Sequence, residues 1–199
     1  MWVKICGLTD EAAVQAVARS GASAAGFVFA PSRRQVTVPR AAALASLLPS
    51  GISKVGVFAD QPLAYIQAAA GAVGLDYVQL HGQETPDFCR QVGLPVIKAF
   101  SITEDFPAGK IKLYLMAGAR ILLDSGSGGS GKAFAWEMIP ADFPHPFILA
   151  GGLTAQNVCA AIKFTGASGV DVSSGVESQG RKDPAKIHEF VRRAKHCPR

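Results

Sequence analysis

Residues able to act as an acid and a base end two apolar segments of this 199-residue sequence. Cys6 ends the segment 2–6, and Asp124 ends the segment 121–124. A thiolate can accept a proton and a carboxyl group can donate one, so both are candidates for general acid–base catalysis. The thiolate role requires nearby positive charge to lower the pKa of Cys6, for which Lys4 and Arg34 are candidates. The alternative is a buried structural thiol and a carboxylate that caps a helix or binds a loop.

Two short segments of small residues follow the last two apolar segments of the chain. They consist of Gly151 and Gly152 in the first and of Ser173, Ser174 and Gly175 in the second. Glycine lets backbone N–H groups approach an oxyanion closely, and serine hydroxyls add donors. One such segment alone would be an ordinary tight turn, but two matched segments in neighbouring units predict a phosphate-binding site.

Eight short apolar segments recur along the chain and are typical of parallel strands buried on both faces, because they do not alternate with polar residues. The predicted strands are residues 2–6, 24–29, 54–58, 77–80, 96–100, 121–124, 147–150 and 169–172. Helical patterns lie between most of them. The predicted helices are 12–20 after a Thr9 cap, 39–48, one capped by Asp60, 83–92, 154–164 and one capped by Asp183, with irregular or short helices within 102–119 and around 136–139.

This alternation predicts an α/β fold, and eight strands favour a closed (β/α)8 TIM barrel, with residues 1–199 as a single domain. An open doubly wound sheet is the alternative, but the first strand leads into Gly7-Leu8-Thr9 and not into a GxGxxG turn. Barrel enzymes carry their active site at the C-terminal strand ends, and many bind phosphate after strands seven and eight. The two small-residue segments occupy those places.

Composition narrows the class of protein further. The net charge of +5 and pI of about 9.2 fit a field that attracts a small anion, because Lys and Arg do not form the long runs expected for nucleic-acid binding. No apolar run approaches the ~20 residues of a membrane span, and no secretory signal is evident, which predicts a cytoplasmic protein. The four cysteines show no metal-binding spacing and are predicted to be free thiols.

Residues 125–132 form a glycine-rich segment directly after Asp124, and we expect it to close over a substrate. Gly126, Gly131 and Lys132 match the spacing of a nucleotide-binding P-loop. Ala133, however, stands where Ser or Thr would bind Mg²⁺, which argues against nucleotide binding.

Seven motifs, each at a predicted strand end, make the chain similar to the phosphoribosylanthranilate isomerase family of tryptophan biosynthesis. They are KICGLT (4–9), GFVF with SRR (26–29 and 32–34), VGVF (55–58), VQLHG (78–82), LLDS (122–125), AGGL (150–153) and GVDVSSGVE (169–177). The resemblance implies an Amadori rearrangement of N-(5-phosphoribosyl)anthranilate, a phosphorylated aminosugar, without a cofactor or metal. It implies that Cys6 is the general base and Asp124 the general acid, and that Arg34 binds the anthranilate carboxylate. His81 and Asp171 match positions that line the substrate pocket.

The sequence departs from the family at one place and leaves alternatives open. The family commonly has Phe-Asp-Trp after the glycine-rich segment, whereas this chain has Phe134-Ala135-Trp136, which predicts a differently anchored segment. A related aminoaldose isomerase of histidine biosynthesis, or a bifunctional enzyme, is an alternative, although such enzymes carry a carboxylate where this chain has Cys6. A non-catalytic anion-binding module is a distant alternative, and the chain is expected to be a monomer or a homodimer.

Overall fold

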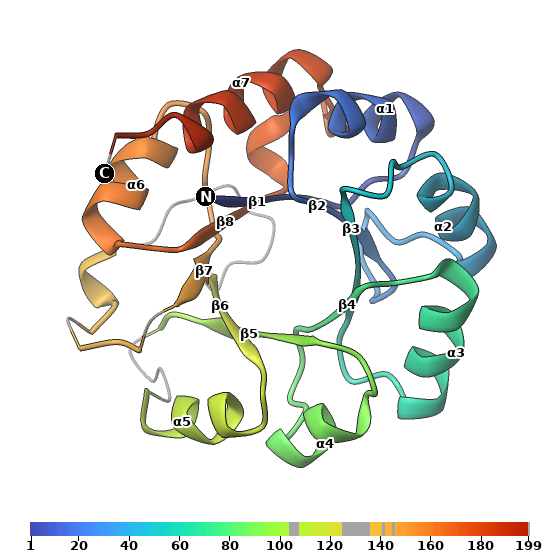
Figure 1. Ribbon diagram of the computed structural model, residues 1–199, viewed down its shortest axis with the longest axis vertical. Helices are drawn as coiled ribbons and strands as arrows, with labels where there is room; N and C mark the ends of the chain where they lie inside the picture. Colours follow the sequence, from blue (N-terminus) through green and yellow to red (C-terminus); the bar gives the residue numbers. More distant parts are fainter. Residues whose placement is uncertain (104–107, 125–135, 141, 145, 199) are drawn as a thin grey trace.

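Eight parallel strands close into a barrel in the order β1 to β8, and helices surround it (Figure 1). The structure is a computed structural model that describes residues 1–103, 108–124, 136–140, 142–144 and 146–198. The strands are β1 (Trp2–Cys6), β2 (Ala24–Val28), β3 (Ser53–Phe58), β4 (Tyr77–Leu80), β5 (Val96–Ser101), β6 (Arg120–Asp124), β7 (Phe147–Leu149) and β8 (Gly169–Val172). The predicted (β/α)8 barrel is confirmed, and the open sheet is wrong because β1 pairs with both β2 and β8.

The helices lie between the strands along the chain. They are α1 (Glu11–Ser20), α2 (Val38–Ala45), α3 (Leu63–Val73), α4 (Pro86–Gln91), α5 (Ala108–Met116), the 3-10 helix η1 (Trp136–Met138), α6 (Val158–Thr165), the 3-10 helix η2 (Ser174–Val176) and α7 (Pro184–Lys195). A two-stranded hairpin of β9 (Glu177–Ser178) and β10 (Arg181–Lys182) follows η2. No helix among the described residues is long and apolar enough to cross a membrane.

Four predicted helix starts differ from the structure, and one of them is that of α4, which begins at Pro86 after a Thr85 cap and not at residue 83. Asp10, not Thr9, caps α1 and accepts a hydrogen bond from the Ala13 N–H. Asp60 lies in the left-handed region (φ 60°) and bonds the Gln83 N–H, so Pro62 precedes α3 instead. The α6 helix begins at Val158. The predicted Asp183 cap is confirmed.

The strands divide their side chains between two compartments. One large cluster, which includes Val3, Ile5 and Phe27, packs against helix residues such as Val14 and Phe190. A smaller cluster fills the barrel interior and comprises Ala24, Val55, Ile97, Ala99, Leu122, Ile148 and Ala150. Because side chains alternate along a strand, the residues two apart from these, including Asp124 after Leu122, face the same interior.

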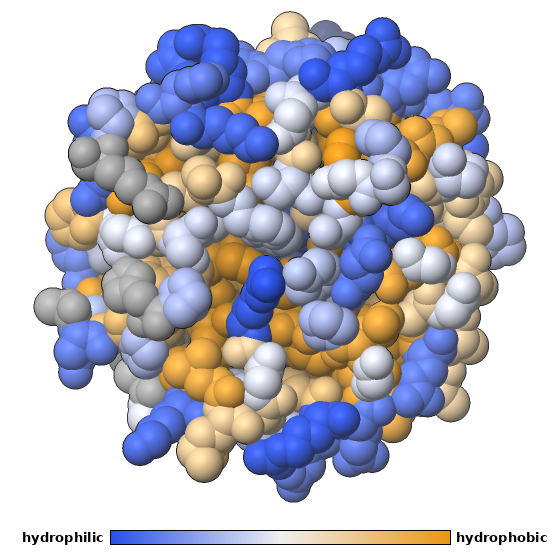
Figure 2. Space-filling view, viewed as in Figure 1, coloured by the Kyte–Doolittle hydropathy of each residue, from blue (hydrophilic) through white to orange (hydrophobic). Residues whose placement is uncertain are grey.

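At the end where the strands begin, Trp2, Tyr77 and Arg120 line a groove of about 600 Å³. In Figure 1 the strands follow one another clockwise from β1 to β8. Strand–helix–strand connections between parallel strands are right-handed, and such a barrel has clockwise strand order when it is viewed from the N-terminal ends of its strands. Figure 1 therefore shows the N-terminal strand ends facing the reader. The Arg120 guanidinium lies 5.0 Å from the centre of the Tyr77 ring at the start of β6 and β4. Apolar surface surrounds the centre of this face, with hydrophilic side chains above it (Figure 2). Because the active sites of such barrels lie at the C-terminal strand ends, catalytic residues are expected at the opposite end.

A buried ion pair fixes the segment after β4. The Lys98 ammonium on β5 donates to Glu84 Oε2 at 2.9 Å and to the Gly82 carbonyl at 2.6 Å. Glu84 in turn accepts hydrogen bonds from the N–H groups of Asp60 and Gly82. Both side chains are 2% exposed, so each charge depends on the other for compensation.

The prediction of four free thiols is wrong for two of the cysteines. Cys159 on α6 and Cys197 just beyond α7 form a disulfide with their Cα atoms 5.4 Å apart, whereas Cys6 and Cys89 are free. The pair is separated by 38 residues and is brought together by the packing of α6 against α7, as the position of the C-terminus beside α6 in Figure 1 shows. Sequence spacing alone contains no signal for such a pair.

Removing the charge of Glu84 tests the buried pair. We expect Glu84→Gln to lower the free energy of unfolding by about 3 kcal/mol, because the Lys98 charge stays buried without its partner. Urea denaturation measures this. Glu11→Gln, which breaks an exposed pair with Arg40, is the control and should cost less than about 1 kcal/mol. Equal small losses in both variants would contradict the role given to the buried pair.

Reduction of the disulfide tests the link between α6 and the C-terminus. A cross-link spanning 38 residues should stabilise the native state by roughly 3–4 kcal/mol, because it restricts the unfolded chain. Dithiothreitol should therefore lower the melting temperature of the oxidised protein. Cys197→Ser should melt at that lower temperature with or without reductant. An oxidised protein whose melting does not respond to reductant would contradict this link.

Candidate active site

Four side chains of acid–base character meet at the C-terminal ends of the strands. Cys6 ends β1, His81 follows β4, Asp124 ends β6 and Asp171 lies within β8. A cavity of about 60 Å³ is lined by both Asp124 and Asp171 together with residues 150–153 and 172–175. A larger groove of about 560 Å³ lies against α7 on the far side of the same two loops, but its lining includes none of the four side chains. The smaller cavity is therefore the better candidate for the chemistry.

A buried ion pair lies beneath Cys6. Lys4 and Asp171 are neighbours in the register of β1 and β8, and Lys4 Nζ lies 2.9 Å from Asp171 Oδ2. Lys4 is fully buried and is two residues from Cys6, so both side chains face the barrel interior and interact. The other carboxylate oxygen, Asp171 Oδ1, is buried with no hydrogen-bond partner among the described residues. Such an oxygen is suited to accept a hydrogen bond from a substrate hydroxyl.

The pKa of the Cys6 thiol is raised, which contradicts the sequence-based expectation of a lowered pKa. Burial is the main cause, and the negative charge of Asp171 adds to it. Lys4 opposes both through its charge and a hydrogen bond to the thiol, and the charge of Lys182 also opposes them. At neutral pH the thiol form is therefore favoured in the ligand-free protein. The predicted source of positive charge, Lys4, is in place, but it does not outweigh desolvation.

His81 and Asp124 form the second part of the cluster. His81 Nε2 lies 3.6 Å from Asp124 Oδ2. Burial lowers the pKa of His81, and this effect exceeds the opposing effect of the Asp124 charge. His81 is therefore a neutral imidazole at pH 7, able to donate from one ring nitrogen and accept at the other. Its backbone N–H donates to the Phe58 carbonyl at 2.8 Å, which fixes the start of this loop.

Glycine residues determine the backbone geometry of the loops after β7 and β8. Gly151 and Gly152 both have positive φ angles, 81° and 63°. A Cβ atom on Gly175 would lie 1.8 Å from the Leu153 carbonyl oxygen, so the two loops pack together only because this residue is glycine. The Ser173 hydroxyl donates to the Cys6 carbonyl at 3.0 Å. It thereby connects the loop after β8 to the strand that carries Cys6.

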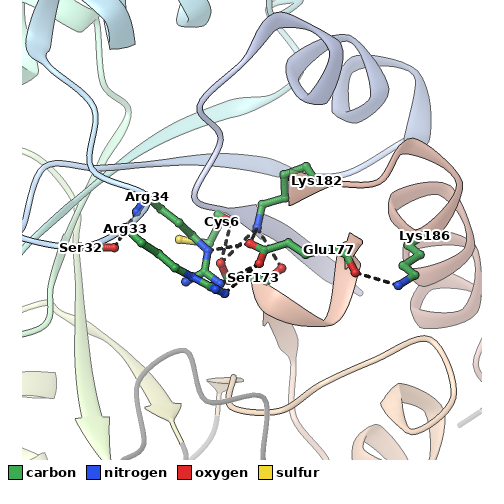
Figure 3. Close-up of polar contacts among 8 residues, drawn as sticks. All are labelled: Cys6, Ser32, Arg33, Arg34, Ser173, Glu177, Lys182 and Lys186. Carbon is green, nitrogen blue, oxygen red and sulfur yellow. Dashed lines mark hydrogen bonds and ion pairs between the residues drawn. The ribbon is translucent and has the colours of Figure 1, made fainter. Parts of the chain in front are cut away.

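Arg34 is held at the rim of the site by a carboxylate of the protein itself. Its Nε lies 2.6 Å from Glu177 Oε1, and its Nη2 lies 3.0 Å from Glu177 Oε2 (Figure 3). The aliphatic part of Arg34 crosses Gly7, where a Cβ atom would come within 2.4 Å of Arg34 Cδ. Gly7 also has a φ of 78°, which favours glycine. The residue after Cys6 is thus constrained by its own backbone and by Arg34.

Sequence reasoning missed two residues of this cluster, Glu177 as the partner of Arg34 and Lys182 as the second cation on Glu177. The two-residue turn of Gln179 and Gly180 that returns Lys182 to Glu177 has positive φ at both residues, and in the sequence only Gly180 indicates it. The partnership of Lys4 was also detectable in part, because Lys4 and Cys6 are two apart on one strand. Residues 126–131 and Ala135 lie outside the described residues. Within the described part of the chain, no group of three or more His, Cys, Asp or Glu side chains could hold a metal ion.

The fold and these side chains define an enzyme of the (β/α)8-barrel class with its active site at the C-terminal strand ends. A family model described as N-(5'-phosphoribosyl)anthranilate (PRA) isomerase matches residues 3–193. The chain belongs to this family and is an isomerase of tryptophan biosynthesis.

Individual relatives agree with this assignment over their full length. The chain is 46% identical to the N-(5'-phosphoribosyl)anthranilate isomerase of Listeria welshimeri, with 98% of each chain covered. The solved phosphoribosyl anthranilate isomerase of Thermotoga maritima is similar with a TM-score of 0.87 and 38% identity, again with 98% of each chain covered. A phosphoribosyl anthranilate isomerase solved in complex with reduced 1-(o-carboxyphenylamino)-1-deoxyribulose 5-phosphate has a TM-score of 0.85 and 36% identity, also with 98% of each chain covered.

The pH dependence of Cys6 reactivity tests the role of Lys4. We expect Lys4→Met to move the midpoint of Cys6 alkylation by iodoacetamide to higher pH, because the ammonium favours the thiolate and its loss leaves the weaker effect of Lys182 to oppose burial and Asp171. The rate is measured against pH in a Cys89→Ser background. Circular dichroism shows whether the variant is folded. A folded variant with an unchanged or lower midpoint would contradict this role.

Proposed function

We propose that this chain converts N-(5-phosphoribosyl)anthranilate into 1-(2-carboxyphenylamino)-1-deoxyribulose 5-phosphate by an Amadori rearrangement. The observation that carries the proposal is the meeting of Cys6, Asp171 and Asp124 at one barrel mouth beside two glycine-containing loops. A reduced product of this kind is the ligand of a solved relative of the chain. The substrate needs one proton placed on its ring oxygen and another removed from sugar C2. One acid and one base suffice for that, and no cofactor is required.

The proposed reaction begins at Asp124. Its carboxyl group donates a proton to the furanose ring oxygen, and the C1–O bond breaks as the anilino nitrogen forms a Schiff base with C1. Cys6 then removes the proton from C2, and the electron pair moves toward the nitrogen to give an enolamine that tautomerises to the ketone. The Schiff base is cationic, and positive charge near Cys6 favours the thiolate. The cation formed in the first step therefore favours loss of the Cys6 thiol proton to solvent, and the resulting thiolate can accept the C2 proton.

The other side chains are proposed to bind the substrate. Arg34 binds the anthranilate carboxylate, and Asp171 Oδ1 accepts a hydrogen bond from a sugar hydroxyl. Neutral His81 orients the carboxyl group of Asp124. The proposed phosphate site is formed by the small residues of the two loops, namely Gly151, Gly152, Ser173, Ser174 and Gly175. Because the Ser173 hydroxyl bonds the Cys6 carbonyl, we assign the phosphate contact of this residue to its backbone N–H.

The surroundings of the reaction are also proposals. The chain is proposed to work in the cytoplasm, as one domain and as a monomer or homodimer; a related isomerase from Thermotoga maritima is described as dimeric. In a reducing compartment Cys159 and Cys197 would be kept as thiols, so their disulfide would close only on oxidation. Sedimentation at several concentrations measures the oligomeric state, and titration of free thiols before and after reduction measures the state of the disulfide.

Two substitutions test the acid and the base. We expect Cys6→Ala and Asp124→Asn each to lower the turnover number by about 10²–10⁴-fold, because each removes one proton transfer. The fluorescence of the anthranilate group follows the reaction. Cys89→Ser, which alters a free thiol on α4, is the matched control and should retain turnover. A wild-type protein without turnover would contradict the proposed function, and near-normal turnover in a variant would contradict the role of that residue.

A further inference from the structure

We propose that Glu177 is a positioning residue that orients Arg34 toward the substrate carboxylate and couples Arg34 to the strand end of Cys6. The inference rests on the proposed function, because it concerns how the same site recognises the anthranilate group. Glu177 lies at the centre of the cluster drawn in Figure 3, with Arg33 and Arg34 on one side and Lys182 on the other.

A local fold brings Glu177 into this position. The short hairpin of β9 and β10 pairs Glu177 with Lys182 directly across the two strands, and Lys182 Nζ lies 2.7 Å from Glu177 Oε1. The Glu177 and Lys182 side chains are 6% and 2% exposed. Buried charges of this kind are costly unless geometry and hydrogen bonds compensate them. Glu177 meets that condition with ion pairs to Arg33, Arg34 and Lys182, and Arg34 and Lys182 hold its pKa low despite burial.

The pattern of contacts on Arg34 indicates what this arrangement does. A guanidinium has five N–H donors in one plane, and Glu177 binds the edge formed by Nε and Nη2. Within the described part of the chain, the edge formed by Nη1 and the second N–H of Nη2 has no carboxylate partner and can bind another carboxylate. Since one guanidinium can hold two carboxylates in its plane, the Glu177 contact leaves the terminal fork of Arg34 as a bidentate site for the anthranilate group.

The same carboxylate is connected to the base. Lys182 Nζ lies 2.9 Å from the Ser173 carbonyl and 3.2 Å from the Ser173 hydroxyl, which itself donates to the Cys6 carbonyl. The charge of Lys182 also favours the thiolate form of Cys6. Glu177 thus lies between Arg34 and Lys182 in a chain of contacts that continues through Ser173 to the strand end of Cys6. Glu177 contacts Arg34 directly and Cys6 only through other residues. Removing the charge of Glu177 should therefore weaken binding of the substrate carboxylate more than it affects Cys6.

Binding of two matched ligands tests the proposal. The probes are reduced 1-(o-carboxyphenylamino)-1-deoxyribulose 5-phosphate and the corresponding phenylamino compound without the carboxyl group, titrated calorimetrically. We expect Glu177→Gln to weaken binding of the first by about tenfold or more and of the second by no more than about twofold. Glu189→Gln is the control, because Glu189 also pairs with two arginines but lies on the exposed face of α7. It should bind both ligands as the wild type does.

Each outcome decides between orientation of Arg34 and a merely structural role. Equal weakening for both ligands means that Glu177 only maintains the fold of the mouth, and no weakening means that Arg34 does not need it; either overturns the inference. If Glu177→Gln does not fold, Glu177→Asp, which keeps the charge but shortens its reach, must show the same selective loss. Failure of the proposed function is separate, because it would appear as absent turnover in the wild-type enzyme.

Discussion

The buried contact between Lys4 and Asp171 is the interaction on which the site depends. It joins the first strand to the last, where the barrel closes, and it does so inside the barrel at 0% exposure of the lysine. A lysine at this depth retains its charge only because opposite charge is close, and its pKa is in fact raised by Asp171 and Cys6 against the effect of burial. The same ammonium is the strongest influence that favours a thiolate at Cys6. Closure of the fold and preparation of the base therefore rest on one pair of charges.

Two further lysines repeat this arrangement around the mouth. Lys98 and Glu84 fix the loop that begins with His81, and Lys182 and Glu177 fix the loop that follows β8. Replacing a buried ion pair by apolar residues is often neutral or stabilising, so three such pairs are poorly explained by stability alone. Lys4 and Lys98 lie within β1 and β5, whereas Glu84, Glu177 and Lys182 lie beyond the C-terminal ends of β4 and β8. We interpret the three pairs as the means by which loops of irregular backbone hold the side chains of the site in fixed directions.

The parts of this structure that were predictable are those governed by local periodicity. Three strands, such as β1 from Trp2 to Cys6, have the predicted bounds, because continuous apolar runs flanked by turns leave little choice. The positions of Cys6, Asp124 and Asp171 at the mouth followed from the barrel rule. Contacts that depend on two distant segments were not predictable: Arg34 meets Glu177 across 143 residues, and Cys159 meets Cys197 only because α6 packs on α7. The raised pKa of Cys6 was missed because burial, unlike charge, cannot be counted from a sequence.

The electrostatic contrast between the two halves of the site has a consequence for the order of proton transfers. On one side Cys6 is a thiol whose charged form is disfavoured by burial but favoured by two lysines, and on the other side His81 is neutral beside Asp124. If the Cys6 thiol were fully ionised in the ligand-free protein, a second buried negative charge would lie next to that of Asp171. In the proposed reaction the positive charge of the Schiff base arises only after Asp124 has donated its proton, so the proposed acid acts before the proposed base. The contact with Glu177 compensates the charge of Arg34, so that Arg34 adds no unpaired cation beside Cys6. The positive charges that favour the Cys6 thiolate are therefore those of Lys4, Lys182 and, in the proposed reaction, the substrate.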